Sequence, residues 1–202
     1  GAGAMAVVGN RGTGVTSRDG GGSWQRQTLA GQPFLLDVTA CPDGSFVALA
    51  YENEIHIGDT EAGNWQRVAI DSEEVPQAVA CDPQGRIWVV GSFSSILSST
   101  DRGRTWSATS MDEDLHFTTV QFIDSDTAFL TGEFGVVVRT TDGGATWEYL
   151  PPLPDEFYPQ DAWFRDADTG WIVGLTGTVL HTENGGRSWS RQETNTQAPL
   201  YT

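Results

Sequence analysis

Paired carboxylates are the side chains of this chain best suited to do chemistry. The chain holds 27 Asp and Glu residues, and hydrolysis of a glycosidic bond needs only two, one to protonate the leaving group and one to attack or to activate water. Glu52 and Glu133 stand in comparable polar loops, and Asp37 and Asp161 stand in comparable apolar strands. Either pair is consistent with a small glycoside hydrolase, and the sequence does not choose between them.

The other reactive residue types give weaker signals. No nucleophile motif surrounds His56, His116 or His181; the first and last are expected to be ordinary sheet residues, and His116 lies nearer the expected binding loops. Carboxylate runs at residues 73–74 and 112–114 lack the ligand spacing of a calcium loop, so we expect solvated charge. No metal and no cofactor are expected.

Two cysteines are too few for a disulfide framework and lack the spacing of a zinc or redox site. Cys41 and Cys81 each lie near the end of an apolar run in adjacent repeats, so a bridge between them is conceivable. We expect two free, buried thiols instead, because free cysteine is commonly buried as a small apolar residue.

The charge of the chain limits its partners. The formal net charge is −16, and every one of the 11 basic residues is arginine. A strongly negative surface repels phosphate backbones and acidic lipids, so nucleic acid and membrane insertion are not expected. Such acidity would also suit a salty habitat, but an ordinary soluble surface is the simpler interpretation, and a monomer is expected.

An internal repeat organises the whole chain. Trp24, Trp65, Trp106, Trp147 and Trp189 follow one another at intervals of 41, 41, 41 and 42 residues. An apolar run ending in a small residue lies 15 residues before each tryptophan, as in residues 87–91 and 170–174. Short apolar runs separated by glycine turns indicate strands, so each repeat predicts several short strands.

A polar turn precedes four of the five tryptophans in closely similar form. Residues 17–24, 99–106, 140–147 and 182–189 each place Asp or Asn before glycine and end in Ser or Thr followed by Trp. The short polar side chain is expected to accept hydrogen bonds from the turn's own backbone, so Asp19, Asp101, Asp142 and Asn184 are interpreted as structural. The second repeat, residues 58–65, shifts Asp and Gly by one position, which predicts a distorted but closed turn.

Four short strands in a period of about 41 residues predict one propeller blade. We therefore expect an all-β fold, a five-bladed β-propeller of four-stranded antiparallel blades forming a single domain over residues 1–202. Residues 199–202 fall in the register of an inner strand, so the two termini are predicted to share one blade. Such sharing would remove free sheet edges.

The repeat resembles the Asp-box, or BNR, repeat of sialidases, sortilin-type receptors and some xyloglucan-degrading glycosidases. The phrase Gly170-Trp171-Ile172-Val173-Gly174, followed by Gly177 and the Asn184 turn, is similar to the photosystem II stability and assembly factor family. The resemblance covers the whole chain, and it implies a propeller that binds a protein or peptide in an extracytoplasmic compartment. Members of that family usually have seven blades. No leader is readable at the N-terminus, so localisation follows from the resemblance alone.

The resemblance to sialidases implies an arginine cluster and a tyrosine nucleophile, which this chain does not provide. Most arginines lie in the Asp-box turns or on expected outer strands; Arg11 stands on the opposite face, and Arg165 is a weaker candidate. A non-catalytic binding protein is therefore our first interpretation. A carbohydrate-binding protein or small glycoside hydrolase is the alternative, with a glycan as its ligand.

Candidate binding residues lie in loops on the face opposite the Asp boxes, where recognition on rigid scaffolds is common. The side chains there are aromatic, apolar or charged, and they either form a binding surface or close the core. The candidates are Arg11, Tyr51, Glu52, Phe93, His116, Glu133, Phe134, Tyr158 and Leu175.

Overall fold

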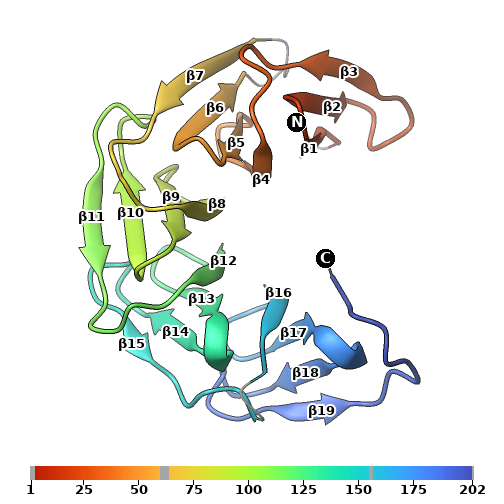
Figure 1. The fold of residues 1–202 in the computed structure, drawn as a ribbon, viewed down its shortest axis with the longest axis vertical. Coiled ribbons are helices and arrows are strands. Elements are labelled where there is room, and N and C mark those ends of the chain that lie inside the picture. The colour runs from red at the N-terminus through yellow and green to blue at the C-terminus, as the bar shows by residue number, and fades with distance from the viewer. Residues whose placement is uncertain (1–2, 60–63, 155–156, 202) are drawn as a thin grey trace. The chain divides into compact units, whose positions relative to one another are not determined.

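The structure, a computed structural model, describes residues 3–59, 64–154 and 157–201. Its regular elements are β-strands and short 3-10 turns, among them η1 (Glu133–Gly135) and η3 (Leu175–Gly177). None of the helices in these ranges is long and apolar enough to cross a membrane. The strands form five antiparallel sheets, which confirms the all-β, five-bladed propeller predicted from the repeat (Figure 1).

The packing groups the chain into two compact units, residues 1–110 and 111–202. The first unit contains three sheets. The first sheet has the order β1 (Met5–Gly9), β2 (Thr13–Ser17) and β3 (Gln25–Thr28). The second has the order β4 (Leu35–Ala40), β5 (Phe46–Ala50), β6 (Glu54–Gly58) and β7 (Trp65–Ala69). The third consists of β8 (Pro76–Cys81), β9 (Ile87–Gly91), β10 (Ser95–Ser99) and β11 (Ser107–Ser110).

The second unit contains two sheets of the same design. The fourth sheet has the order β12 (Phe117–Phe122), β13 (Ala128–Gly132), β14 (Val137–Thr140) and β15 (Glu148–Tyr149). The fifth has the order β16 (Pro159–Phe164), β17 (Gly170–Gly174), β18 (Val179–Thr182) and β19 (Ser190–Gln192). We call β4, β8, β12 and β16 the inner strands; each carries a register shift after its first residue.

Each unit has its own core, built where neighbouring sheets face one another. In the first unit Val47, Leu49 and Ile55 pack against Val79 and Val89 of the next sheet. In the second unit Phe129 of β13 stacks on Phe164 of β16, with ring centroids 3.8 Å apart. Burial of one such side chain contributes about 2 kcal/mol of transfer free energy, so sheet-to-sheet packing stabilises each unit.

The Asp-box side chains have the local role predicted for them. Asp142 accepts the backbone N–H of Thr146 at 2.9 Å and the hydroxyl of the same residue at 2.6 Å, while the Thr140 hydroxyl donates at 2.8 Å. Asp19 and Asp101 make the equivalent bonds, whereas Asn184 accepts the N–H of Ser188 at 2.9 Å and donates from its amide to the Ser188 hydroxyl at 2.8 Å. Hydrogen bonds to the charged form favour it, and bonds from Thr146 lower the pKa of Asp142 to about 2.

The second repeat closes its turn differently. Asp59 donates its backbone N–H to the carbonyl oxygen of Asn64 at 3.2 Å, and the Asn64 amide donates to the Asp59 carboxylate at 2.9 Å. The remaining residues of the predicted distorted turn, 60–63, lie outside the described residues.

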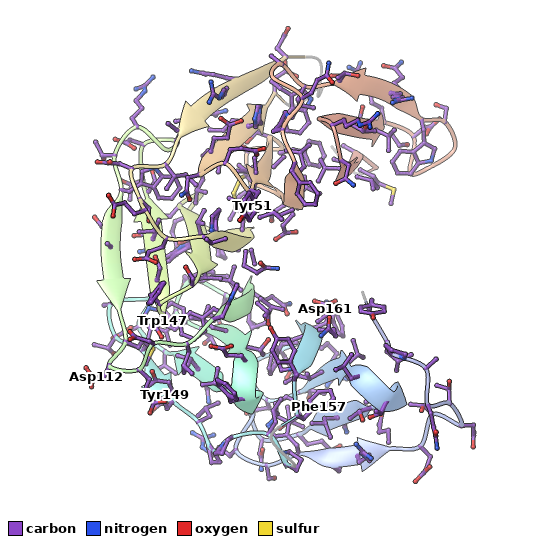
Figure 2. The ribbon with its side chains drawn as sticks, in the orientation of Figure 1. Tyr51, Asp112, Trp147, Tyr149, Phe157 and Asp161 are labelled. Carbon is purple, nitrogen blue, oxygen red and sulfur yellow. A yellow bond between two sulfur atoms is a disulfide. The ribbon has the colours of Figure 1, made fainter. Side chains whose placement is uncertain are left out.

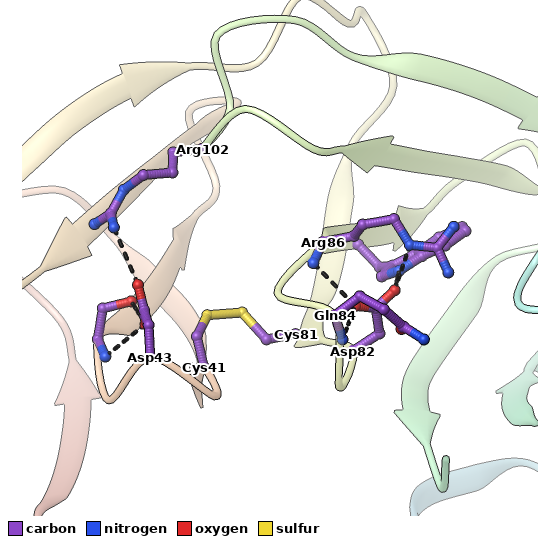
Figure 3. Close-up of a disulfide and its surroundings, with 9 residues drawn as sticks. Cys41, Asp43, Cys81, Asp82, Gln84, Arg86 and Arg102 are labelled. Atoms are coloured by element: carbon purple, nitrogen blue, oxygen red, sulfur yellow. Dashed lines mark hydrogen bonds and ion pairs between the residues drawn. A yellow bond between two sulfur atoms is a disulfide. The ribbon is translucent and has the colours of Figure 1, made fainter. Parts of the chain in front are cut away.

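The prediction of two free thiols is wrong: Cys41 and Cys81 form a disulfide, with their Cα atoms 5.1 Å apart (Figure 3). Cys81 ends the inner strand β8, and Cys41 directly follows the inner strand β4. These strands lie side by side, since the Asp37 carboxylate accepts the backbone N–H of Val79 at 2.9 Å. The same lateral contact brings the two sulfur atoms together.

The first sheet has three strands among the described residues instead of four. The C-terminal residues predicted to complete it form no strand up to residue 201, and Leu200 donates its backbone N–H to the carbonyl oxygen of Gly174 at 2.9 Å. Terminal sharing of a blade therefore stays a prediction.

Candidate functional site

Seven of the nine candidate binding residues lie in the turns that join the second and third strands of each repeat, while His116 and Tyr158 directly precede the inner strands β12 and β16. We call these turns the rim turns: residues 10–12, 51–53, 92–94, 133–135 and 175–177. In each sheet the strand that follows the rim turn runs to the Asp-box turn, so the two kinds of turn lie at opposite ends of the sheet.

Four of the rim turns adopt the backbone conformation of type I′. In the fourth sheet Val136 donates its N–H to the carbonyl oxygen of Glu133 at 3.2 Å, and both central residues have positive φ, 56° at Phe134 and 72° at Gly135. The turns at 10–13, 92–95 and 175–178 have the same hydrogen bond and the same signs of φ. The second sheet differs, since only Asn53 of its turn has positive φ.

The residue types in these turns are unusual. Type I′ turns favour Asn, Asp or Gly at the first central position, because a β-carbon is crowded at positive φ. This chain places Arg11, Phe93, Phe134 and Thr176 there, at φ of 53° to 57°. The turn conformation does not account for these side chains, and strained, bulky turn residues often have a binding role.

The aromatic side chains at the rim point into solvent. Phe134 is 65% exposed, Phe93 60% and Tyr51 55%. Leu175 and Tyr158 are also exposed, at 41% and 39%. Tyr51, Phe93 and Phe134 therefore do not close the core, which was the alternative interpretation of these residues.

In the first unit the rim turn of the second sheet joins the loop that leads into β4. Phe34 and Tyr51 meet edge to face, with ring centroids 6.5 Å apart. Both carboxylate oxygens of Glu52 accept the backbone N–H of Phe34 at 3.3 Å, and Tyr51 donates its N–H to the Phe34 carbonyl oxygen at 2.9 Å. Two exposed rings are thereby held in one orientation.

The same connection recurs in the fourth sheet. Glu133 donates its N–H to the carbonyl oxygen of His116 at 3.0 Å, and its carboxylate accepts the N–H of His116 at 3.0 Å. In the third sheet Ser92 donates its N–H to the carbonyl oxygen of Val75 at 3.0 Å, and its hydroxyl oxygen accepts the N–H of Val75 at 2.9 Å. Glu52 and Glu133 therefore position the rim, while Nε2 of His116 has no hydrogen-bond partner among the described residues.

A small apolar pocket lies beside Phe134. It has a volume of about 230 Å³ and is lined by Glu113, Leu115, Phe134, Val136, Tyr149, Leu150 and Pro152. Tyr149 belongs to the outer strand β15, as Figure 2 shows. We call this the Phe134 pocket. Only Phe134 of its lining was a candidate from the sequence; apart from Val136, the other residues come from an outer strand and from loops distant in sequence.

The other candidate carboxylate pair, Asp37 and Asp161, has one member in each unit. Asp37 is engaged by backbone N–H groups, those of Val38 at 2.7 Å and Val79 at 2.9 Å. Asp161 on β16 is half-buried, and removal from water raises the pKa of its carboxyl. Figure 2 shows Asp161 on the inner strand of the fifth sheet.

The two arginine candidates lie at opposite ends of their sheets. Arg11 is exposed in a rim turn. Arg165 donates to Asp166 at 2.9 Å and to the Thr169 hydroxyl at 3.0 Å, within the turn between β16 and β17. This turn is at the Asp-box end, since Gly185 of the box donates to Asp168, so Arg165 does not belong to the rim.

No group of three or more His, Cys, Asp or Glu residues suited to a metal ion occurs in the described part of the chain. The described residues instead show exposed rings, an apolar pocket beside Phe134 and carboxylates bonded to backbone amides. Such an arrangement can bind the side chains of another molecule.

Comparison with known proteins confirms the resemblance found in the repeat. Residues 57–156 match the family model described as photosynthesis system II assembly factor YCF48. A search of curated proteins found no significant match.

Several solved structures share the fold. A structure of YCF48 bound to D1 peptide is 20% identical with a TM-score of 0.72, and the match covers 90% of this chain and 61% of that one. YCF48 from Cyanidioschyzon merolae is 18% identical with a TM-score of 0.72, covering 98% and 72%. Virginiamycin B lyase from Staphylococcus aureus is 13% identical with a TM-score of 0.76, covering 96% and 71%. At these identities the likeness shows the fold, and this chain spans 61% of the first of these proteins.

Proposed function

We propose that this chain is a non-catalytic propeller that binds a protein or peptide through its rim turns, on the face opposite the Asp boxes. The observation that carries the proposal is the placement of exposed Phe93 and Phe134 at left-handed positions of type I′ turns. Large side chains in such positions lower the stability of the turn and expose apolar surface to water. Both features are explained if a partner binds these side chains and covers that surface.

The Phe134 pocket indicates what part of a partner would bind. Its lining combines two aromatic rings with leucine, valine and proline, which suits one apolar side chain as an anchor. The chain carries a net charge of −16, so basic residues near the anchor would increase the association rate. The YCF48 structure with a bound D1 peptide supports a peptide as the ligand class.

The disulfide supports an extracytoplasmic location. Disulfides form and persist in oxidising compartments and are rare where thiols are kept reduced. The Cys41–Cys81 bond is therefore consistent with the location that the resemblance to the assembly factors implies.

The experiment is a binding titration with two probes, a D1 peptide and peptides selected from a random library on the purified chain. The double variant Phe93→Ala, Phe134→Ala should weaken binding at least about tenfold, as removal of anchor residues does. Trp163→Ala is the matched control, because Trp163 is an exposed aromatic residue on strand β16, outside the rim turns.

Equal binding by the double variant and the native chain would contradict the proposal. So would binding restricted to a glycan array, or turnover of fluorogenic glycosides, with no peptide selected by the library.

A further inference from the structure

Two exposed aromatic side chains meet at the rim of the second sheet. Phe34 directly precedes β4 and is 48% exposed, and Tyr51 directly follows β5 and is 55% exposed. Their ring planes are inclined by 75°, with the centroids 6.5 Å apart. In an edge-to-face pair, the ring that contributes its edge keeps both of its faces clear of the other ring. With half of each side chain in solvent, the pair offers a ring face to another molecule.

The backbone connection beneath these rings does not depend on them. The same bond that joins the N–H of the turn to the loop before the inner strand joins Ser92 to Val75 in the third sheet and Glu133 to His116 in the fourth. Those residues are neither Phe nor Tyr, so the connection forms without a ring pair. Exposed aromatic rings that the fold does not need are features of binding surfaces.

Glu52 places a carboxylate beside the ring pair. Its side chain is exposed, and both of its oxygens accept the backbone N–H of Phe34 at 3.3 Å. An ionised carboxylate has about four acceptor positions, so one shared N–H leaves capacity for further donors. In the described ranges, no ion pair involves Glu52 and no cation–π contact involves Phe34 or Tyr51. The charge and the ring faces are therefore available to a cation from another molecule.

One cation can contact both groups at once. A positive charge within about 6 Å of a ring centroid is attracted by the negative face of the ring, and a carboxylate attracts it as well. The hydrogen bond from Phe34 holds the Glu52 carboxylate next to the residue that carries one of the rings. The net charge of −16 also favours the approach of a cation over that of an anion.

Other ligand chemistries fit this place less well. An apolar side chain over the rings would shield the Glu52 carboxylate from water without pairing with it, which costs free energy. A phosphate or carboxylate group would be repelled by the same charge.

We propose that Phe34, Tyr51 and Glu52 form a site for a cationic side chain, an arginine or lysine of the peptide partner. This inference rests on the proposed function, which supplies the peptide as the ligand class. The site lies in the first unit and shares no residue with the Phe134 pocket. It therefore adds a requirement for positive charge to the apolar anchor already proposed.

The experiment is an NMR titration of the native chain with N-acetylarginine amide, followed through the ring and amide resonances of Phe34. The matched probe is N-acetylcitrulline amide, which has a planar side chain of the same length without the charge. We expect the arginine derivative to bind at least about fivefold more tightly, as cation–π contacts at exposed sites predict. Added salt should weaken its binding, because salt screens exposed charges.

Variants of Tyr51 test the contribution of the ring. Tyr51→Leu keeps an apolar side chain but removes the ring, and it should weaken binding of the arginine derivative about threefold or more. Tyr51→Phe keeps the ring face and should bind as the native chain does. Trp163→Ala is the control for loss of an exposed ring elsewhere, on strand β16, and should leave the affinity unchanged.

Variants of Glu52 test the contribution of the charge. In Glu52→Gln the amide oxygen can still accept the N–H of Phe34, so the ring pair keeps its support while the charge is lost. The arginine derivative should then bind more weakly and with less dependence on salt. Glu148→Gln removes one exposed charge from the outer strand β15 and is the matched control.

Equal affinities of the native chain for the arginine and citrulline derivatives would overturn the proposal. Native affinity for the arginine derivative in both Tyr51→Leu and Glu52→Gln would overturn it as well. Failure of the proposed function is a different result, since no library peptide would then bind the native chain. Library peptides that bind without any arginine or lysine would support the proposed function and contradict the cationic site.

Discussion

Glu133 and His116 are joined by two hydrogen bonds of 3.0 Å, one from the N–H of Glu133 to the carbonyl oxygen of His116 and one from the N–H of His116 to the Glu133 carboxylate. The carboxylate therefore acts as a backbone acceptor, which an amide oxygen can replace. We expect Glu133→Gln to leave peptide binding and the free energy of unfolding nearly unchanged, and Glu133→Ala to lower the latter by about 1 kcal/mol. Urea denaturation and the binding titration measure both. Loss of a glycosidase activity in Glu133→Gln would instead assign the carboxylate to catalysis.

Phe134 is held in a backbone conformation that favours Asn or Gly, with φ of 56°. We expect Phe134→Asn to raise the free energy of unfolding by about 1 kcal/mol, because the left-handed conformation costs less for Asn. The same variant should bind peptide more weakly. Tyr51→Asn is the matched control, since Tyr51 is exposed at the rim but does not have positive φ. A destabilised Phe134→Asn protein would refute the strain argument.

The Asp-box carboxylates should make the fold sensitive to acid. Asp19, Asp101 and Asp142 have pKa values lowered to about 2, mainly by hydrogen bonds from Ser23, Thr105 and Thr146. A lowered pKa in the folded state contributes stability above the ordinary pKa of about 4 and loses it as the pH falls toward about 2. We expect the Asp142→Asn variant to fold at neutral pH. Between about pH 4 and about pH 2 its free energy of unfolding, measured by urea denaturation, should fall less than that of the native chain. Asn184 already occupies this position in the fifth sheet.

The disulfide should contribute substantially to stability. It closes a loop with a sequence separation of 40 residues, which on the chain-entropy account corresponds to about 4 kcal/mol. The double variant Cys41→Ser, Cys81→Ser should lose about that amount in guanidinium denaturation. Dithiothreitol should destabilise the native chain and leave the double variant unchanged; an equal effect on both would contradict the assignment.

Glu54 is a buried acceptor for two side chains. It is 4% exposed, accepts from Arg67, and lies 2.9 Å from Nε2 of His56. We expect Glu54→Ala to lower the free energy of unfolding by about 2 kcal/mol, because it leaves the buried imidazole of His56 without its hydrogen-bond partner. Exposed Glu148→Ala should change it by less than about 0.5 kcal/mol. Chemical denaturation of both variants measures the difference.

The repeat allowed the sheets to be predicted, because five tryptophans mark the same turn and the apolar runs before them fix the strands. The disulfide was mispredicted because the sequence places the two cysteines in adjacent repeats without giving the distance between their strands, and the common burial of free cysteine favoured two thiols; the contact of Asp37 with Val79 shows that the two inner strands lie side by side. The Phe134 pocket was missed for a similar reason, since Leu115 and Tyr149 reach it from different elements.

A second family of turns was also missed. Asp43, Asp82, Asp124 and Asp166 each accept backbone N–H groups within the turn that follows an inner strand. Their spacing is less regular than that of the tryptophans, and no single neighbouring residue marks them. Asp82 also receives the indole N–H of Trp88 at 3.0 Å, which no local pattern indicates (Figure 3 shows Asp82 beside Arg86).

The bond between Cys41 and Cys81 also determines how the chain would respond to a protease. The residues between them include β5, β6 and β7, three of the four strands of the second sheet. One cut anywhere in this stretch leaves both pieces joined by the disulfide. The cut protein therefore stays one covalent molecule until a reductant separates the pieces.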